Sequence, residues 1–248
     1  MKMFRTARLE TFAIALVALS TQAGAQPLTP TGVFGSQPTM TFGGTGIPNN
    51  AVMTNSNEVA LGVTLGLTAT QRCGLIGCNP ALTNDGNGTF YTSAGTDFNP
   101  PSPANPYATW NFGFYIGGAN ASQYNYKIFY DFNPASGNSD YGNLSIAPVP
   151  TQNSWNLGMD FLSAPSVLPG SIFPPPGTFD PNAPGEYSIG LIAYRNELTG
   201  GLTEVGRTSI QVNTTVPEPS TYVLMASGLA ALAFVSKRRN RKNLASFT

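Results

Sequence analysis

Apolar and polar residues alternate along several short segments of this chain, as they do in β-strands with one face toward a core. The clearest case is residues 124–132, where tyrosine, isoleucine and phenylalanine fill one parity, whereas the other carries Asn125, Lys127 and Asp131. The same reasoning predicts strands at residues 59–68, 88–92, 109–116, 155–161, 187–194 and 204–212, and an edge strand near residues 39–42. Turns rich in glycine and proline separate these segments, and the body shows no helical period.

Three connections between the predicted strands carry turn signatures. Residues 117–122 predict a hairpin loop between neighbouring strands, and Gly200-Gly201 predicts a second turn. A Pro-Gly-x-Tyr sequence places Tyr187 at a strand start, where its hydroxyl either bonds back to the preceding arch, as in the tyrosine corner of β-sandwiches, or has no such role. The predicted fold is all-β: a single antiparallel β-sandwich, immunoglobulin-like or jelly-roll-like, over residues 58–215. The proline-rich residues 26–57 are predicted as an extended lead-in.

The first 25 residues have the three-part layout of a secretory signal peptide. A basic opening precedes an apolar core at residues 12–19, and Ala23-Gly-Ala25 forms a small-x-small cleavage site. Cleavage after Ala25 makes Gln26 the first residue of the mature chain. The alternative is an uncleaved N-terminal anchor, which the shortness of the apolar core disfavours.

An apolar run at residues 221–236 is predicted to form a C-terminal transmembrane helix. The basic cluster that follows it consists of Lys237, Arg238, Arg239, Arg241 and Lys242. Because basic residues stop transfer and stay on the cytoplasmic side, the body of the chain is expected on the far side of the membrane. The run is shorter than the roughly 20 residues that span a bilayer comfortably, which fits a temporary anchor. A permanent single-span anchor is the alternative.

Charge is distributed unevenly along the chain. The whole sequence is neutral, but the body between the two targeting segments has ten acidic and four basic side chains, a net charge of −6. Nucleic-acid binding requires clustered lysine and arginine, and the body lacks such a cluster, so it is not expected to bind a nucleic acid. With roughly 190 residues it is long enough for one domain with its own core.

The two cysteines, Cys73 and Cys78, are predicted to form a disulfide that closes a short loop. They are the only cysteines, and an exported chain meets an oxidising environment. Two thiols cannot complete a four-ligand metal site in a chain without histidine, and their spacing differs from that of redox pairs. Such a disulfide should contribute roughly 2 kcal/mol of stability.

The chain offers little catalytic chemistry, and we predict that it is not an enzyme. The absence of histidine excludes Ser-His-acid triads and Cys-His pairs. A pair of carboxylates, as in glycosidases, is still available from Asp131, Asp160 and Asp180, each near the end of a predicted strand. A solvated or turn-capping aspartate is the simpler interpretation of each.

Two binding functions are compatible with the body. One loop contains four residues with the hard oxygen atoms that calcium prefers, although it lacks the spacing of an EF-hand. These residues are Asp131, Asn133, Asn138 and Asp140. Trp110 and Trp155 would stack on the sugar rings of an exopolysaccharide if they are exposed, and burial in the core is the alternative for both. No other metal or cofactor is predicted.

The residues before the C-terminal apolar run carry a specific resemblance. The sequence Val216-Pro217-Glu218-Pro219-Ser220, followed by an apolar helix and a basic cluster, resembles the PEP-CTERM sorting signal of Gram-negative bacteria. The likeness extends to residue 242, with every part of the signal in order. The two prolines hold the segment extended, and the serine is a suitable N-cap for the helix.

The resemblance implies a destination and a partner. It implies recognition and cleavage near the Pro-Glu-Pro sequence by an exosortase in the inner membrane, while the body lies in the periplasm. It also implies release to the surface or extracellular matrix of bacteria that make exopolysaccharide. The predicted function is therefore an exported, exosortase-sorted surface or matrix protein without catalytic activity. The alternative is a carbohydrate-binding module for exopolysaccharide.

Overall fold

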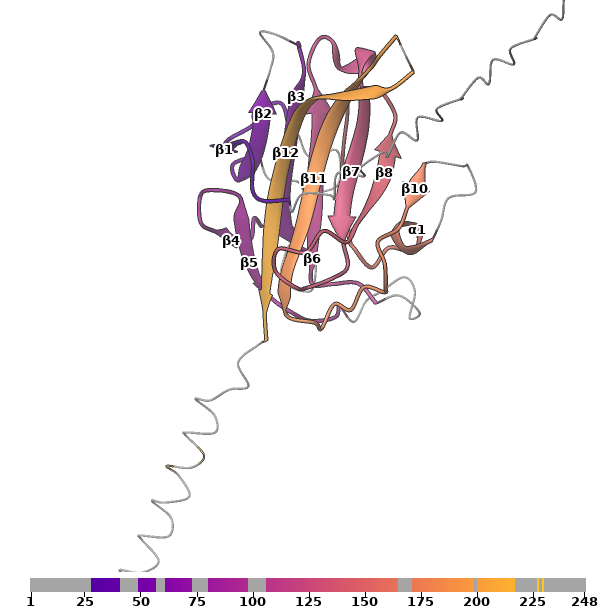
Figure 1. The fold of residues 1–248 in the computed structure, drawn as a ribbon. Helices are drawn as coiled ribbons and strands as arrows, with labels where there is room; N and C mark the ends of the chain where they lie inside the picture. Colours follow the sequence, from indigo (N-terminus) through magenta and orange to yellow (C-terminus); the bar gives the residue numbers. More distant parts are fainter. Residues whose placement is uncertain are drawn as a thin grey trace, which may run out of the picture.

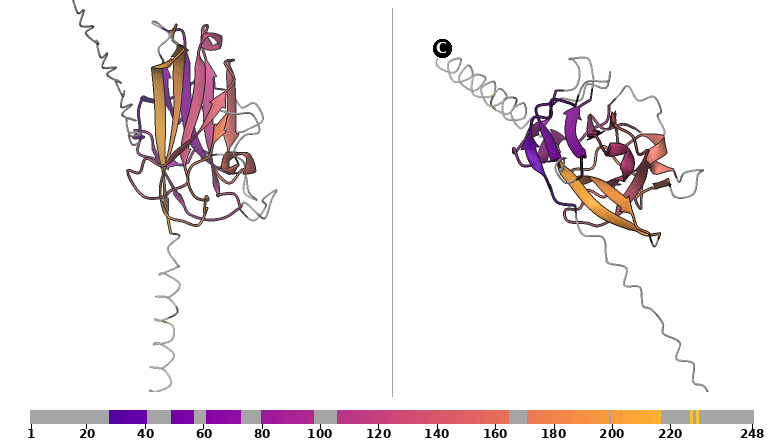
Figure 2. Two further views of the ribbon diagram at one scale, coloured as in Figure 1. Left: turned by 45° about the vertical axis from the view of Figure 1, so that its right-hand side comes forward. Right: turned by 90° about the horizontal axis from the view of Figure 1, so that it is seen from above.

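The computed structural model describes residues 28–40, 49–56, 61–72, 80–97, 106–164, 171–198 and 200–216, together with Ser227 and Leu229. These residues form two β-sheets packed face to face, with very little helix (Figures 1 and 2). The predicted all-β class is therefore confirmed. The predicted signal peptide, both cysteines, the sorting motif from Pro217 onward and the basic cluster lie outside the described residues.

One sheet has five strands in the order β1-β2-β3-β6-β9, and all of its pairs are antiparallel. Its strands are β1 (Val33–Gly35), β2 (Val52–Ser56), β3 (Thr64–Gln71), β6 (Trp110–Gly117) and β9 (Thr151–Trp155). Strands β1 and β2 lie in the stretch predicted as a lead-in. Of the edge strand predicted near residues 39–42, residues 39 and 40 are not in a strand, and residues 41 and 42 lie outside the described residues. The lead-in joins the sheet because Phe34 and Met53, paired in register, both contribute apolar side chains to the core.

The other sheet has seven strands in the order β10-β8-β7-β11-β12-β5-β4. Its strands are β4 (Thr83–Asn84), β5 (Thr89–Ser93), β7 (Asn125–Asp131), β8 (Tyr141–Ile146), β10 (Ile172–Phe173), β11 (Gly185–Asn196) and β12 (Leu202–Thr215). Strands β5 and β12 pair in parallel, which corrects the antiparallel prediction. Directly after β5, residues 94–97 pair with residues 107–109 ahead of β6. This pairing lies at the end of the sandwich where β12 leaves the sheet, so β5 runs toward that end, in the same direction as β12.

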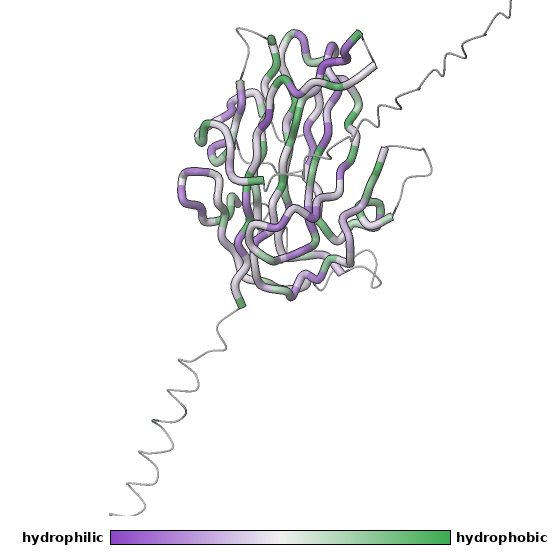
Figure 3. Tube along the Cα trace, in the orientation of Figure 1, coloured by the Kyte–Doolittle hydropathy of each residue, from purple (hydrophilic) through white to green (hydrophobic). Residues whose placement is uncertain are grey.

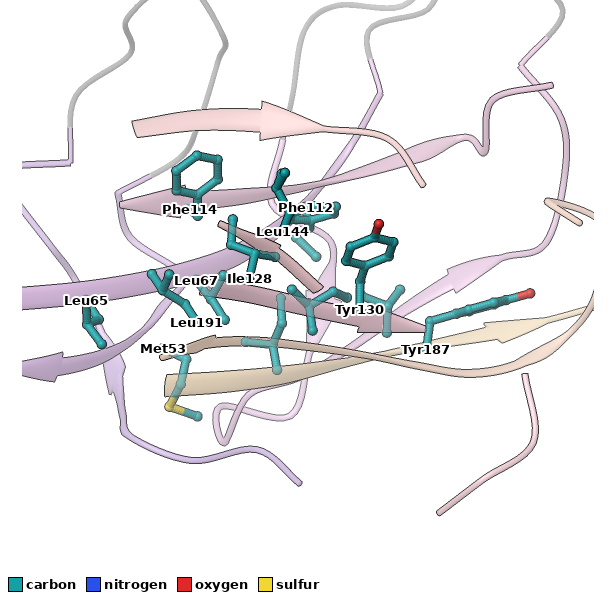
Figure 4. Packing of buried hydrophobic residues seen from close by; sticks show 14 of the residues in the cluster. Met53, Leu65, Leu67, Phe112, Phe114, Ile128, Tyr130, Leu144, Tyr187 and Leu191 are labelled. Carbon is teal, nitrogen blue, oxygen red and sulfur yellow. The ribbon is translucent and has the colours of Figure 1, made fainter. Parts of the chain in front are cut away.

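The core lies between the two sheets. Phe112 and Phe114 of β6 meet Ile128 and Tyr130 of β7 and Leu191 of β11, and all five side chains are buried (Figure 4). Along β7 the buried side chains alternate as the sequence predicted. Hydrophobic and hydrophilic residues are interspersed along the strands (Figure 3). Burial of these large side chains is the main favourable term in folding.

The connection between β6 and β7 is not the predicted hairpin, because the two strands belong to different sheets. Residues 118–124 pass over the end of the core and include a short 3-10 helix, η1 (Ala121–Gln123). Ala121 is buried and its carbonyl accepts a hydrogen bond from Tyr126 Oη at 2.7 Å. Both strands have a strongly apolar face, and opposite sheets let these two faces bury one another.

The strand predicted at residues 155–161 is also wrong: β9 ends at Trp155, and α1 (Asp160–Ser163) follows. The buried Asn156 explains where the strand stops. Its Nδ2 donates to the carbonyls of Ala108 at 2.9 Å and Trp110 at 2.6 Å, and its Oδ1 accepts from the Ala108 amide at 2.9 Å. The Asn156 side chain thereby bonds the backbone groups at the start of β6 with which a longer β9 would pair.

Strand β3 is buried on both faces, whereas its alternation predicted one exposed face. The face with small residues is covered by Met40 and Val52, which lie over Gly66. A side chain at position 66 would crowd Val52, so glycine permits this close cover. Met40 and Val52 lie outside β3 in the sequence, so the alternation within β3 could not predict that they bury its second face.

Two local predictions in β11 and β12 are correct. Tyr187 donates from Oη to the carbonyl oxygen of Ala183 at 3.0 Å, and the carbonyl of Asp180 lies 3.3 Å from the same hydroxyl. This is the back-bond of a tyrosine corner. The turn between the strands contains Gly200 at a φ of 86°, a value that favours glycine.

Candidate functional site

Strand β12 holds the chain up to the start of the sorting motif. Its last residue, Thr215, pairs with Ser93 of β5, and its carbonyl oxygen accepts from the Ala94 amide at 2.7 Å. On the other side, Thr214 accepts at Oγ1 from the Gly185 amide at 3.0 Å. Val216 is the first residue beyond the strand and is 59% exposed. One residue therefore separates the folded sheet from Pro217.

The N-terminal segment of the described chain, residues 28–31, is fixed to the same strand. Thr31 and Ser209 exchange two backbone hydrogen bonds of 3.1 Å, and Gln211 Nε2 lies 3.4 Å from the carbonyl oxygen of Leu28. These contacts join residues up to 183 positions apart. The predicted cleavage before Gln26 thus falls two residues ahead of Leu28, which is held by the sheet.

Leu28 is buried on the face of the seven-stranded sheet that points away from the core. Its side chain lies over Gly190 of β11, where a Cβ atom would come within 3.0 Å of it. Its amide donates to Tyr141 Oη at 2.7 Å. The absence of a side chain at position 190 therefore makes the slot that receives Leu28.

A group of polar side chains, the outer polar cluster, lies on this face beside the N-terminal segment. Its members are Asp131, Tyr141, Glu186, Ser188 and Gln211. Gln211 Nε2 donates to Glu186 Oε1 at 2.9 Å, and Tyr141 pairs with Asp131 in the ladder of β7 and β8. Sequence reasoning did not find this cluster, because only the register of four strands brings its members together.

Asp131 is the fully buried member of the outer polar cluster. Its two carboxylate oxygens each lie 3.3 Å from the Ser188 amide, and Asn138 Nδ2 donates to Oδ2 at 3.3 Å. Burial raises the pKa of the Asp131 carboxyl to about 7, although these hydrogen bonds act in the opposite direction. The nearby charges of Glu186 and Asp140 raise it further.

The four calcium candidates do meet in one loop after β7, but an amide group lies at its centre. Asn138 Nδ2 donates to Asp131 Oδ2 and to the carbonyls of Asn133 at 2.9 Å and Ala135 at 2.8 Å. Asn133 in turn donates from Nδ2 to Asp140 Oδ2 at 2.8 Å. The Oδ1 atoms of Asn133 and Asn138 accept from the amides of Ala135 and Asp140, so each of the four candidate side chains already accepts a hydrogen bond from an N–H group. Within the described part of the chain, no group of three acidic or cysteine side chains could hold a metal ion.

The three carboxylates proposed as catalytic candidates lie on different elements. Asp131 ends β7 and is buried, whereas Asp160 begins α1 and Asp180 precedes β11, and both of these are exposed. Asp180 Oδ1 accepts from the Asn182 amide at 2.9 Å, as a turn-capping aspartate does. Each position thus has a local structural explanation.

The two tryptophans considered for sugar stacking differ in burial. Trp110 is 2% exposed and packs against Tyr187 inside the core, so the exposed orientation considered for it is wrong. Trp155 is half-buried, with its ring centroid 4.7 Å from that of Phe114 and 5.3 Å from that of Phe161.

Comparison with protein families identifies the C-terminal end of the chain. Residues 215–239 match the PEP-CTERM protein-sorting motif, so the resemblance read from the Pro-Glu-Pro sequence is confirmed. The match begins at Thr215, the last residue of β12. Comparison with curated proteins and with solved structures finds no match for the chain. Within the described residues, no helix has the length and apolar character needed to cross a membrane.

The motif defines a class of exported proteins. A PEP-CTERM signal implies export, a transient membrane anchor and processing by an exosortase, which is itself a membrane protein. The motif covers the end of the chain and carries no information about what the two-sheet body binds or does.

We expect calcium to leave the stability of the protein unchanged. An oxygen of each of the four candidate side chains already accepts a hydrogen bond from an N–H group, so a metal would have to displace these donors. The measurement is the thermal midpoint with millimolar calcium and with a chelator. A midpoint that rises with calcium in the natural protein, but not in Asp131→Asn, would establish the loop as a calcium site.

Stability should fall as the pH rises from about 4 to about 7, because of Asp131. The carboxyl ionises near 3.8 in the unfolded chain and near 7 in the folded protein, so the unfolded state alone gains the charge in this window. The difference corresponds to roughly 4 kcal/mol. Urea unfolding across this range should show the slope in the natural protein and lose it in Asp131→Asn.

The matched control for this measurement is Asp140→Asn, which changes an exposed carboxylate in the same loop. This variant should keep most of the pH slope, because burial raises the pKa of Asp131 more than the charge of Asp140 does. If Asp131→Asn retains the slope of the natural protein, the carboxyl of Asp131 is not its source.

Proposed function

We propose that the chain is the precursor of an exported, exosortase-sorted protein that acts without catalysis at the cell surface or in the extracellular matrix. The observation that carries the proposal is the sorting motif at residues 215–239, directly after the last strand of the fold. Residues 221–236 would serve as the transient inner-membrane helix, with the basic cluster in the cytoplasm. Removal of both targeting segments would leave the two-sheet body, beginning at Gln26.

Several properties of the body support a role without catalysis. The sequence contains no histidine, and the exposed Asp160 and Asp180 occupy a helix start and a turn. A disulfide between Cys73 and Cys78 would suit a protein that works outside the cell. Exopolysaccharide of the matrix is the partner that such a location offers. A hydrolytic activity that disappears in Asp160→Asn or Asp180→Asn would contradict this part of the proposal.

The position of the motif limits how the precursor can meet its processing enzyme. Five residues, 216–220, separate the end of β12 from the apolar run. Even fully extended they reach only about 17 Å. A folded body in the anchored precursor would therefore sit with the Thr215 end of its sandwich close to the membrane surface. The enzyme would have to bind the motif within that interval.

Intact mass spectrometry of the protein released by a host that carries an exosortase tests the proposal. The expected species begins at Gln26 and ends within residues 217–220, because the signal peptide and the membrane helix are both removed. A variant with Pro217→Ala and Pro219→Ala should keep its full C-terminus and stay in the membrane fraction. A released protein that retains the basic cluster, or a natural protein that remains full-length in the inner membrane, would contradict exosortase sorting.

A further inference from the structure

Strands β4 and β5 form one edge of the sandwich (Figure 1). A groove lies at this edge, and its lining shares no residue with the outer polar cluster. Its volume is about 530 Å³, within the range of small-molecule sites in proteins. The residues that line it are Gln71, Ala81, Leu82, Thr83, Tyr91, Thr92, Ser93, Ala94 and Thr109. They come from both sheets, so the groove lies where the two sheets meet along this edge.

The first wall of the groove is fixed by backbone hydrogen bonds between the sheets. Residues 80–82 form backbone hydrogen bonds with the end of β3. The Gln71 amide donates to the Pro80 carbonyl at 3.0 Å, and the Leu82 amide donates to the Ala69 carbonyl at 3.1 Å. The next residues continue as β4, which pairs with β5 of the other sheet. This wall therefore joins both sheets.

The second wall is formed where β5 leads into β6. The Thr109 amide donates to the Gly95 carbonyl at 3.2 Å, and Thr109 Oγ1 donates to the Ser93 carbonyl at 3.3 Å. Both walls are thus held by hydrogen bonds that form with the fold. A ligand would enter a preformed groove, which lowers the entropic cost of binding.

The lining is neutral. Gln71, Thr83 and Ser93 are exposed polar residues, and the buried Leu82 and Ala94 add apolar surface. None of the described residues of the lining carries a charge, so phosphate groups, carboxylates and metal ions would find no opposite charge among them. The lining can instead offer hydroxyl and amide groups, which both donate and accept hydrogen bonds.

Arg72, which follows Gln71 in the chain, is engaged in two charge interactions. Arg72 forms an ion pair with Asp97, and its guanidinium carbon lies 4.4 Å above the centroid of the Tyr107 ring. Neither Arg72 nor Asp97 belongs to the described lining of the groove.

Tyr91 gives the groove an aromatic surface. Its neighbour Phe90 is buried in the core, whereas Tyr91 is 42% exposed and lines the groove. A tyrosine ring has apolar faces and a polar tip, so it suits a ligand that is apolar on one face and polar around its edge. A sugar ring has this character, with C–H groups on its faces and hydroxyls at its edge.

We propose that this groove binds a neutral saccharide, with Tyr91 stacking on a sugar ring and Gln71, Thr83 and Ser93 bonding its hydroxyls. The inference is independent of exosortase processing: it would give an exported body a ligand, and it can fail while the sorting proposal stands. Binding of one chain is expected to be weak, because a single aromatic side chain and a few polar groups contribute. Several copies on one polysaccharide would raise the avidity.

The processed protein should be screened against an array of neutral glucan, mannan and galactan oligosaccharides, with polyuronates and a proline-rich peptide as other ligand classes. Titration of a positive neutral oligosaccharide should show binding that weakens at least about tenfold in Tyr91→Ala, as expected for loss of a stacking residue. Tyr91→Phe keeps the ring and should bind within about threefold of the natural protein. Thermal melts of all variants establish that they are folded.

Phe173→Ala is the matched control, because Phe173 is 52% exposed on β10 at the opposite edge of the same sheet. It should leave binding unchanged. The proposal is overturned if no neutral oligosaccharide binds, if only polyuronates or the peptide bind, or if folded Tyr91→Ala binds as well as Phe173→Ala.

Discussion

The rest of the structure depends on the hydrogen bonding of strand β12 along both of its edges. One edge pairs with β11 from Leu202 to Thr214. The other edge is shared: Ser209 pairs with Thr31 of the N-terminal segment, and Gln211 to Thr215 pair in parallel with β5. Three distant parts of the chain are thereby fixed to one strand. The core residues Ile210 and Val212, which lie on its inner face, are buried as a result.

This arrangement brings the two ends of the mature body onto the same strand. Residues 28–31 lie against β12 just after the predicted signal cleavage, and the sorting motif begins where β12 ends. The chain is thus structured almost up to both predicted cuts. The released protein would be a compact body with very short tails, and its ligand contacts would come from the sheets and their loops. The groove beside Tyr91 and the outer polar cluster around Asp131 are two such features in the described part of the chain.

The features that the sequence predicted correctly are local. The alternation in residues 124–132 and the back-bond of Tyr187 depend on neighbours within a few positions, and the sorting motif is contiguous. The errors concern long-range contacts. The lead-in forms β1 and β2, and it contacts β12 through Thr31 and Met53. Strands β6 and β7 lie in different sheets, where β6 pairs with β9 and β7 with β11, both distant in the chain. The outer polar cluster and the groove are formed by sheet register, which alternation and spacing do not specify.

The central claim is that the sheet holds the chain up to Thr215, immediately before the sorting motif. Hydrogen exchange of the processed protein measures this most directly, because it reports local opening residue by residue. The amides of Ala94 and of residues 211–215 that bond within the sheet should be protected as strongly as the core strands. The amides at the tip of the β11–β12 hairpin, near Gly200, provide the exposed reference. Exchange at residues 211–215 as fast as at this tip would show that the end of β12 is not held by the fold.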